Sequence, residues 1–212
     1  MPEPAKSQEA VGVQGTAMNA GYAAAAERIE AETGLPRGVV LDIGCNTGDG
    51  MRVLAARWPE AELIGLEPVL RFALIARRHG CRVEQAIAER IPLEDASVDV
   101  VFSRHSLEHV QRRAVALAEI ARVLKPGGLV YIQAPLEPGG TENLLHISPF
   151  ETADELRSLF PGWPEIYWGP QPTVAELIVQ KPQSRNAGRD GALHSFHPSP
   201  PASAGPGAEP CN

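Results

Sequence analysis

The pattern of apolar and polar residues predicts alternating strands and helices through the middle of the chain. Short apolar runs that end at a glycine or an acid are typical of buried parallel strands. Such runs occur at 39–43, 62–66, 81–85, 97–102 and 128–134. Stretches with helical periodicity separate most of them, at 51–58, 69–79 and 110–124. This alternation predicts an α/β fold, a parallel sheet with helices on both faces.

The C-terminal part of the pattern predicts a reversed edge on this sheet. A helix is expected over 150–160, with Thr152 as its N-cap and Glu155 three residues later. Two further strands are expected at 165–168 and 174–180, joined by the turn sequence GPQP. Such a hairpin would add an antiparallel edge to the parallel strands.

The chain divides into one domain with two polar ends. Residues 1–16 are small and polar and are expected to form a disordered N-terminus. Residues 17–181 are expected to form the domain, and the Pro/Gly/Ser-rich segment 182–212 a disordered tail. Between Thr16 and Thr33 the alanine-rich sequence predicts a helix that either covers a site as a lid or packs on the sheet edge.

Composition narrows the class of partner. With 212 residues, 43% of them hydrophobic, the chain can bury one sizeable core, and its net charge of -7 argues against binding duplex nucleic acid. No apolar run reaches the length of a membrane span, and no signal-peptide pattern opens the chain. Three scattered cysteines indicate a reducing compartment. We therefore expect a cytoplasmic protein with a small-molecule partner; nothing indicates its oligomeric state.

The sequence VVLDIGCNTGDG at 39–50 predicts a buried strand that runs into a glycine-containing turn and then a helix. Glycine at positions 44 and 48 permits positive φ and close approach of a ligand, and Asn46 between them tolerates a left-handed conformation. The loop and the helix N-terminus would present N–H groups to a nucleotide-like ligand. Purely structural strand-to-helix corners also contain G-x-x-x-G, so further features are needed.

Glu67 supplies the second feature, because it follows Gly44 by 23 residues, at the end of the next predicted strand. At this spacing an acid reaches the two ribose hydroxyls of a nucleotide whose other end lies on the glycine loop. Dinucleotide-dependent dehydrogenases and methyltransferases share both features.

Four ordered stretches decide between these classes: VVLDIGCNTG, LIGLEP, AERIPLEDASVDVVFSRHSLEHV and EIARVLKPGGLVYI, which together span 39–132. In this order and spacing the chain resembles the class I S-adenosylmethionine-dependent methyltransferases of the small-molecule type. The resemblance implies a Rossmann-like, seven-stranded, mostly parallel sheet with helices on both faces and an antiparallel C-terminal edge strand. It also implies S-adenosyl-L-methionine as cofactor.

The resemblance assigns roles to individual positions. Asp42 would fix the glycine loop, and the backbone around Gly44 and Cys45 would hold the methionine end of the cofactor. Glu67 would bind the ribose, while Pro68, Ala88 and Glu89 would lie along the adenine. The complete set implied for the cofactor is Asp42, Gly44, Cys45, Asn46, Gly48, Glu67, Pro68, Ala88, Glu89 and Ser103.

Two positions depart from the family pattern. Asn46 stands where the family has its second loop glycine, an exchange that a left-handed conformation tolerates. Ile87 stands where the family often has an aspartate that hydrogen-bonds the adenine amine. The second departure puts the adenine hydrogen bond in doubt but not the fold.

Methyl transfer mainly requires that a nucleophile be held in line with an already activated methyl group. An oxygen nucleophile also benefits from a base, and His105, at the end of the fourth predicted strand, is the candidate proton acceptor or substrate contact. Histidines, rather than an aromatic cage, surround the expected site, which favours O-methylation over N- or C-methylation. The alternatives are a catalytically silent cofactor-binding protein and a nicotinamide-dependent oxidoreductase.

A histidine-rich constellation raises the question of a metal. On a helix, His105, Glu108 and His109 would point to one side, and His146 could add a fourth ligand. The set resembles the metal sites of ubiquinone-pathway O-methyltransferases and small-RNA end methyltransferases, where an acid usually stands at the position of His105. Because the LEH sequence is also common in metal-free relatives, the sequence led us to expect no metal.

Overall fold

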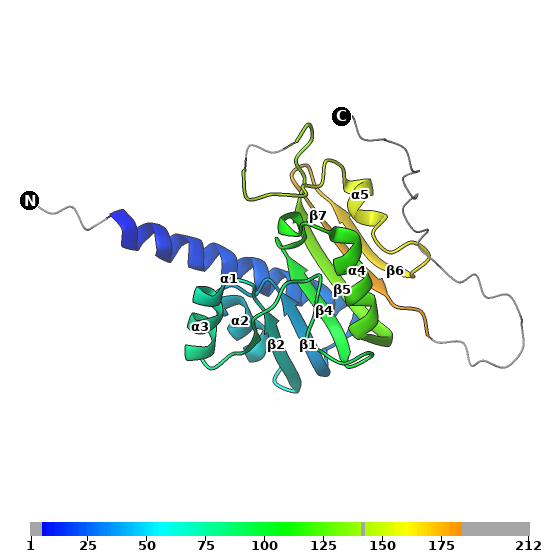
Figure 1. Ribbon diagram of the computed structural model, residues 1–212, viewed down its shortest axis with the longest axis horizontal. Helices are drawn as coiled ribbons and strands as arrows, with labels where there is room; N and C mark the ends of the chain where they lie inside the picture. Colours follow the sequence, from blue (N-terminus) through cyan, green and yellow to red (C-terminus); the bar gives the residue numbers. More distant parts are fainter. Residues whose placement is uncertain (1–5, 141–142, 184–212) are drawn as a thin grey trace, which may run out of the picture.

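The computed structural model describes the backbone of residues 6–140 and 143–183, and side chains from Met18 onward. Its centre is a seven-stranded sheet in the order β3-β2-β1-β4-β5-β7-β6 (Figure 1). The parallel pairs are β2–β3, β1–β2, β1–β4 and β4–β5. The strands are β1 (Gly38–Ile43), β2 (Ala61–Leu66), β3 (Arg82–Glu84), β4 (Val98–Arg104), β5 (Leu124–Pro135), β6 (Glu165–Pro170) and β7 (Val174–Gln180).

The predicted C-terminal hairpin is confirmed, and the structure shows which of its strands is reversed. The last strand, β7, is antiparallel to both β5 and β6 and lies between them, so β6 forms the edge of the sheet. Because the second strand of the hairpin, β7, pairs with β5, its first strand, β6, becomes the outermost strand of the sheet. The mostly parallel sheet with an antiparallel C-terminal element is therefore as the family resemblance implied.

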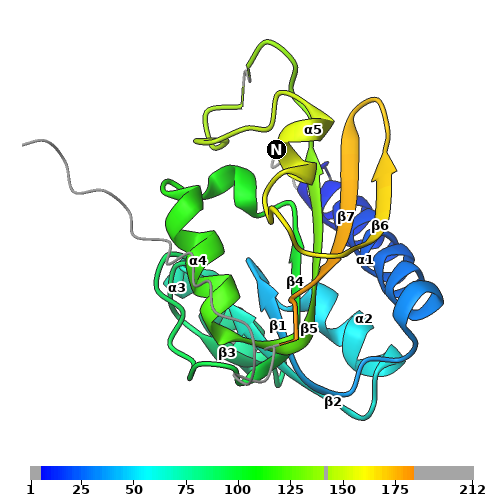
Figure 2. The same ribbon diagram turned by 90° about the vertical axis from the view of Figure 1, so that its right-hand side faces the viewer.

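Helices cover both faces of the sheet, also as predicted. α1 and α2 lie on one face and α4 on the other (Figure 2). α3 packs beside α2 through a small cluster that includes Met51 and Ala76. The helices are α1 (Lys6–Thr33), α2 (Asp49–Arg57), α3 (Leu70–Arg78), α4 (Arg113–Val123) and α5 (Ala153–Arg157), and a 3₁₀ turn, η1 (Leu107–His109), follows β4. Among the described residues, no helix is both long enough and apolar enough to cross a membrane.

The N-terminal helix is longer than the sequence indicated. α1 begins at Lys6 rather than near Thr16, so residues 6–16, which we expected to be disordered, continue the helix. Between Lys6 and Thr33 the sequence contains no proline and many good helix formers, and nothing in it stops a helix before Gly34. Residues 1–5 and most of the expected C-terminal tail, 184–212, lie outside the described residues.

Two other boundaries differ near β4 and β5. The sequence KPGG, which we expected to end a helix before the fifth strand, lies within β5, and Gly127 has a φ of 79° there. The register between β4 and β5 also shifts between Val98 and Val100, which is how the irregular start of β5 is accommodated. At the other end of β4, Leu107–His109 forms a 3₁₀ turn, and α4 starts only at Arg113. His105, Glu108 and His109 therefore do not share one α-helix face.

α1 packs on a face of the sheet rather than at its edge. Tyr22 stacks on Phe102 of β4 with ring centroids 5.1 Å apart, and Phe102 stacks on Tyr131 of β5 at 4.9 Å. All three side chains are buried, in one cluster with Trp58 at the end of α2. Because successive side chains of a strand point to opposite faces, Val40 and Asp42 of β1 face α1, while Leu41 and Ile43 face α4.

Polar contacts fasten α1 to α2 at one end and to the sheet at the other. Glu30 accepts hydrogen bonds from Arg57 at 2.9 and 2.7 Å and from the Trp58 indole at 2.9 Å. The Tyr22 hydroxyl donates to Asp42 Oδ2 at 3.1 Å. Burial raises the pKa of Asp42 to about 7, although the Tyr22 hydrogen bond acts in the opposite direction. The position of α1 is thus tied to the charge state of a carboxyl group at the end of β1.

Glu30→Ala should lower the free energy of unfolding by about 1–2 kcal/mol, because the Trp58 indole and the Arg57 guanidinium lose their shared acceptor. Urea-induced unfolding measures this loss. Glu32→Ala is the matched control, since the nearest contact of Glu32 with Arg28 is 3.8 Å and such exposed pairs contribute only a few tenths of a kcal/mol. Equal losses in the two variants would contradict the anchoring role of Glu30.

The contribution of Asp42 to stability should fall as the pH rises from about 4 to about 7. The pKa of Asp42 is about 7 in the folded protein against 3.8 ordinarily, so folding takes up a proton in this window. This difference between the ordinary and the folded pKa of Asp42 corresponds to a change of roughly 4 kcal/mol in the free energy of unfolding across the whole window. Asp42→Asn keeps an acceptor for Tyr22 but removes the titrating group, so the unfolding free energy of the wild type should fall relative to that of the variant as the pH rises through this window. The same slope in both proteins would contradict this assignment.

Candidate functional site

The candidate site lies at the carboxyl ends of β1, β2 and β4. In the parallel register Asp42 of β1 pairs with Gly65 of β2 and with Phe102 of β4, so these three strands end side by side. The glycine loop, Glu67 and His105 follow the three strands. Ligands of open α/β sheets bind in the crevice outside the carboxyl ends of the strands. The strand topology therefore brings the glycine loop, Glu67 and His105, which are far apart in the sequence, to the same edge of the sheet.

The glycine loop has the backbone conformation that the sequence predicted. Gly44, Asn46 and Gly48 have φ values of 78°, 51° and 82°. A Cβ at position 44 would clash with the Ser106 hydroxyl. One at Gly48 would lie 2.8 Å from Cys81 Sγ. Both glycines are thus required by their protein neighbours as well as by the turn.

The N–H groups of the loop are partly used by the fold. Gly44 and Cys45 both donate to the Leu66 carbonyl, at 2.8 and 3.2 Å. These two N–H groups are therefore already engaged and are not free to donate to a methionine carboxylate. A methionine amine, which is a donor, would need a carbonyl or carboxylate oxygen as its acceptor. The Cys45 side chain is buried in a small core cluster, and burial raises the pKa of this thiol well above the ordinary value.

Glu67 ties the loop to the end of β2. Its side chain is buried, and its two carboxylate oxygens accept hydrogen bonds from two separate backbone segments. Oε2 accepts from the Asn46 N–H at 2.9 Å, and Oε1 accepts from the Val69 N–H at 2.8 Å. An ionised carboxylate has about four acceptor positions. Each oxygen therefore retains capacity for a ligand hydroxyl.

The predicted adenine positions fall into two groups. Pro68 is exposed beside Val69 and Leu70, and Ile87 is 47% exposed, so apolar surface is available after both β2 and β3. Ala88, by contrast, is buried in the core that packs on α4. The Glu89 carboxylate accepts from the Arg112 N–H at 3.1 Å, just before α4. For the side chains of Ala88 and Glu89 the structure therefore shows packing and capping contacts.

The end of β4 carries the remaining predicted residues. Ser103 is fully buried between β1 and β5, and its hydroxyl has no hydrogen-bond partner among the described residues. His105 adopts a positive φ of 50° and donates its N–H to the Gln133 carbonyl at 2.8 Å. Burial and the neighbouring Arg104 lower the pKa of His105 to about 4. Its imidazole is therefore neutral at pH 7.

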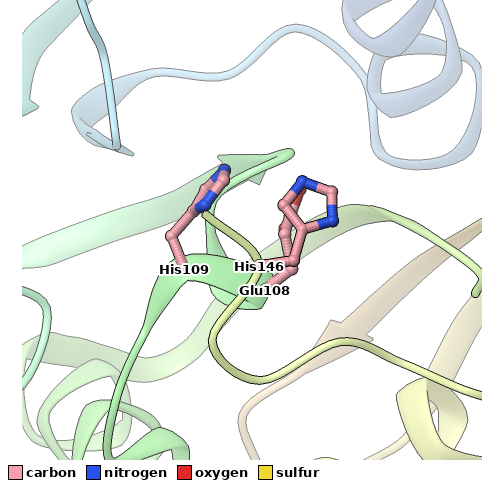
Figure 3. Close-up of side chains that lie close together, drawn as sticks. All are labelled: Glu108, His109 and His146. Atoms are coloured by element: carbon pink, nitrogen blue, oxygen red, sulfur yellow. The ribbon is translucent and has the colours of Figure 1, made fainter. Parts of the chain in front are cut away.

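Three further side chains meet beside His105. Glu108, His109 and His146 each offer a ligand atom, and these atoms lie within 4.8 Å of one another (Figure 3). The two imidazole rings are 4.9 Å apart, edge to face. Burial raises the pKa of Glu108, which has 1% of its surface exposed. His105 stands at the margin of this group, with Nδ1 3.8 Å from Glu108 Oε1.

Sequence reasoning missed two residues that contact the site. Tyr22 of α1 donates to Asp42, and Glu137 lies 2.6 Å from His146 Nδ1. Tyr22 is the one aromatic residue in the alanine-rich sequence 17–33, which was an available signal. No sequence signal pointed to Glu137, because its contact depends on the path of the loop between β5 and α5.

Residues 41–132 match a family described as a methyltransferase domain. The chain is 30% identical over 139 residues to a malonyl-[acyl-carrier protein] O-methyltransferase of Xylella fastidiosa (strain M23), covering 62% of this chain and 45% of the relative. It is 35% identical over 117 residues to a dimethylglycine N-methyltransferase of Parasynechococcus marenigrum (strain WH8102), covering 51% and 41%. The matched regions thus span less than half the length of either curated relative.

The fold also agrees with a solved structure. A putative sarcosine dimethylglycine methyltransferase from Galdieria sulphuraria superposes with a TM-score of 0.67 at 16% identity, covering 77% of this chain and 85% of that one. At this identity the similarity shows the fold alone. The match over residues 41–132, the related sequences and this fold all agree with the resemblance of the chain to the class I S-adenosylmethionine-dependent methyltransferases.

Proposed function

We propose that this chain transfers a methyl group from S-adenosylmethionine to an oxygen atom of a small molecule. One observation carries the cofactor assignment: Asp42 and Glu67, buried carboxyl groups at the ends of adjacent strands, flank a loop with three positive φ angles. A ligand with an amine at one end and two vicinal hydroxyls at the other complements this arrangement.

The residues fit this cofactor at each of its parts. Glu67 is already held by two backbone N–H groups, so its oxygens are oriented before a ribose binds. Exposed apolar side chains at Val69 and Ile87 offer a surface for a purine ring in place of the adenine hydrogen bond that Ile87 cannot make. We assign the Asp42 carboxyl group, which lies at the end of β1 just before the loop, to the methionine end.

S-adenosylmethionine supplies a methyl group on a sulfonium, which is already electrophilic. The protein therefore has to hold the acceptor oxygen in line with that carbon and to receive its proton if the acceptor is a hydroxyl. As the O–CH₃ bond forms, the S–CH₃ bond breaks and its electron pair returns to sulfur. His105, half exposed at the carboxyl end of β4, is the group we assign to contact the acceptor and to receive the proton.

The residues around His105 support the proposal that the methyl acceptor is an oxygen atom. Histidine and carboxylate side chains, rather than a cage of aromatic rings, surround this end of β4. The O-methyltransferase among the relatives is consistent with this assignment, whereas the N-methyltransferase among them requires that amines be tested as well.

Glu67→Ala should weaken S-adenosylmethionine binding by at least about tenfold, as measured by titration calorimetry, because the ribose hydroxyls lose a charged acceptor. Glu62→Ala, at the exposed start of the same strand, is the matched control and should bind normally. Circular dichroism establishes that both variants remain folded. Stabilisation of the wild-type protein by NAD and not by S-adenosylmethionine would instead favour an oxidoreductase.

Methyl transfer itself is tested with a methyl-labelled cofactor and a panel of carboxylate, hydroxyl and tertiary-amine acceptors. Label should appear on an oxygen acceptor, and His105→Asn should slow that transfer by about 10²-fold without weakening cofactor binding. Asparagine tolerates the positive φ at this position, so the backbone should be kept. Added imidazole should restore part of the rate.

Two outcomes would contradict this proposal. Transfer to amines alone would overturn the oxygen assignment. Cofactor binding without transfer to any acceptor would favour a catalytically silent binding protein.

A further inference from the structure

We propose that Glu108, His109 and His146 form a binding site for a divalent transition-metal cation such as Zn²⁺. The three residues come from two segments, the η1 turn and the loop between β5 and α5, and their potential ligand atoms lie within 4.8 Å of one another (Figure 3). Two imidazole nitrogens and one carboxylate oxygen suit Zn²⁺ or Co²⁺ better than Mg²⁺ or Ca²⁺, which prefer oxygen ligands.

The Glu108 carboxylate is the first observation that points to a cation. It is 1% exposed, and neither of its side-chain oxygens has a hydrogen-bond partner among the described residues. The other buried carboxyl groups at this edge differ, because Asp42 accepts from Tyr22 and Glu67 accepts from two backbone N–H groups. A buried carboxylate without donors is costly, and a bound cation compensates its charge.

The orientation of the two histidines is the second observation. His109 Nδ1 lies 2.8 Å from the Leu145 carbonyl oxygen, and His146 Nδ1 lies 2.6 Å from Glu137 Oε1. Each Nδ1 therefore carries the proton that it donates to an oxygen, which leaves the lone pair of a neutral ring on Nε2. Metal-binding histidines characteristically donate their second N–H to a carbonyl or carboxylate in this way.

A cation bound at His146 would replace a hydrogen bond from the Asn143 side chain. Its amide nitrogen lies 2.9 Å from His146 Nε2, and it therefore donates to the lone pair on that atom. A metal bound by His146 takes the place of this amide. Ser148, which donates its N–H to the Glu108 carbonyl at 2.9 Å, holds the loop against η1 independently of Asn143.

Three protein ligands leave a tetrahedral metal with an open position, the arrangement of sites whose metal also binds water or a substrate oxygen. His105 is next to this position, with Nδ1 3.8 Å from the Glu108 carboxylate. The site therefore borders the place assigned to the methyl acceptor. Metal binding itself does not depend on the cofactor or on the reaction, so it is tested separately.

The experiment uses the full chain, purified, stripped with a chelator and titrated with Zn²⁺ and Co²⁺ by calorimetry and visible absorption. We expect about one ion to bind per chain. The Co²⁺-loaded protein should show the visible absorption of Co²⁺ bound by nitrogen and oxygen ligands, and Mg²⁺ should not displace the bound Zn²⁺ or Co²⁺. Glu108→Gln and a double variant of His109 and His146 to alanine should each weaken binding by at least about tenfold. A double variant of His194 and His197 to alanine, which removes two other histidines that are close together in the sequence, is the control and should bind normally.

Glu108→Gln separates metal binding from folding. Glutamine has the same shape and removes a buried charge, so the metal-free variant should melt at the same temperature as the wild type or higher. The rise in melting temperature that Zn²⁺ gives the wild type should be absent from it. Failure of the wild type to bind either ion, or binding that the Glu108 and histidine variants leave unchanged, would overturn the proposal.

Discussion

The parallel register of β1, β2 and β4 is the constraint on which the rest of the structure depends. It aligns the carboxyl ends of the three strands, so residues that follow them along the chain meet at one edge of the sheet. The loop after β1 then lies against the end of β2, where Gly44 and Cys45 donate to the Leu66 carbonyl. A shift of one residue in either pairing would turn Asp42 to the opposite face. The site is therefore a consequence of strand pairing.

Three buried carboxyl groups at this edge differ in the hydrogen-bond donors that they receive. Asp42 has a hydroxyl donor from α1, Glu67 has two backbone N–H donors, and Glu108 has no hydrogen-bond donor among the described residues. Each arrangement has a different consequence. The first links α1 to the protonation state of Asp42, and the second holds both Glu67 oxygens in place, where we propose that a ribose binds. The third leaves the Glu108 carboxyl group without a donor, which is the basis of the proposed cation site.

Two segments outside the central sheet complete the site. α1 reaches it through Tyr22, whose ring also continues the aromatic stack on Phe102 and Tyr131. The loop between β5 and α5 reaches it from the other side through His146, and carries the exposed apolar residues Leu144 and Leu145. The family match over residues 41–132 includes neither of them.

The sequence by itself determined the order of strands and helices, the glycine loop and Glu67, because these depend on local periodicity and on backbone conformations that few residues adopt. Asn46 and Gly48 have the positive φ values that their residue types predicted. Only the tertiary structure decided which donors each carboxylate receives, since those contacts join segments far apart in the chain. Tyr22 and Asp42 are an example, and so are Glu108 and His146, whose approach depends on a 3₁₀ turn and a loop that have no periodic sequence pattern.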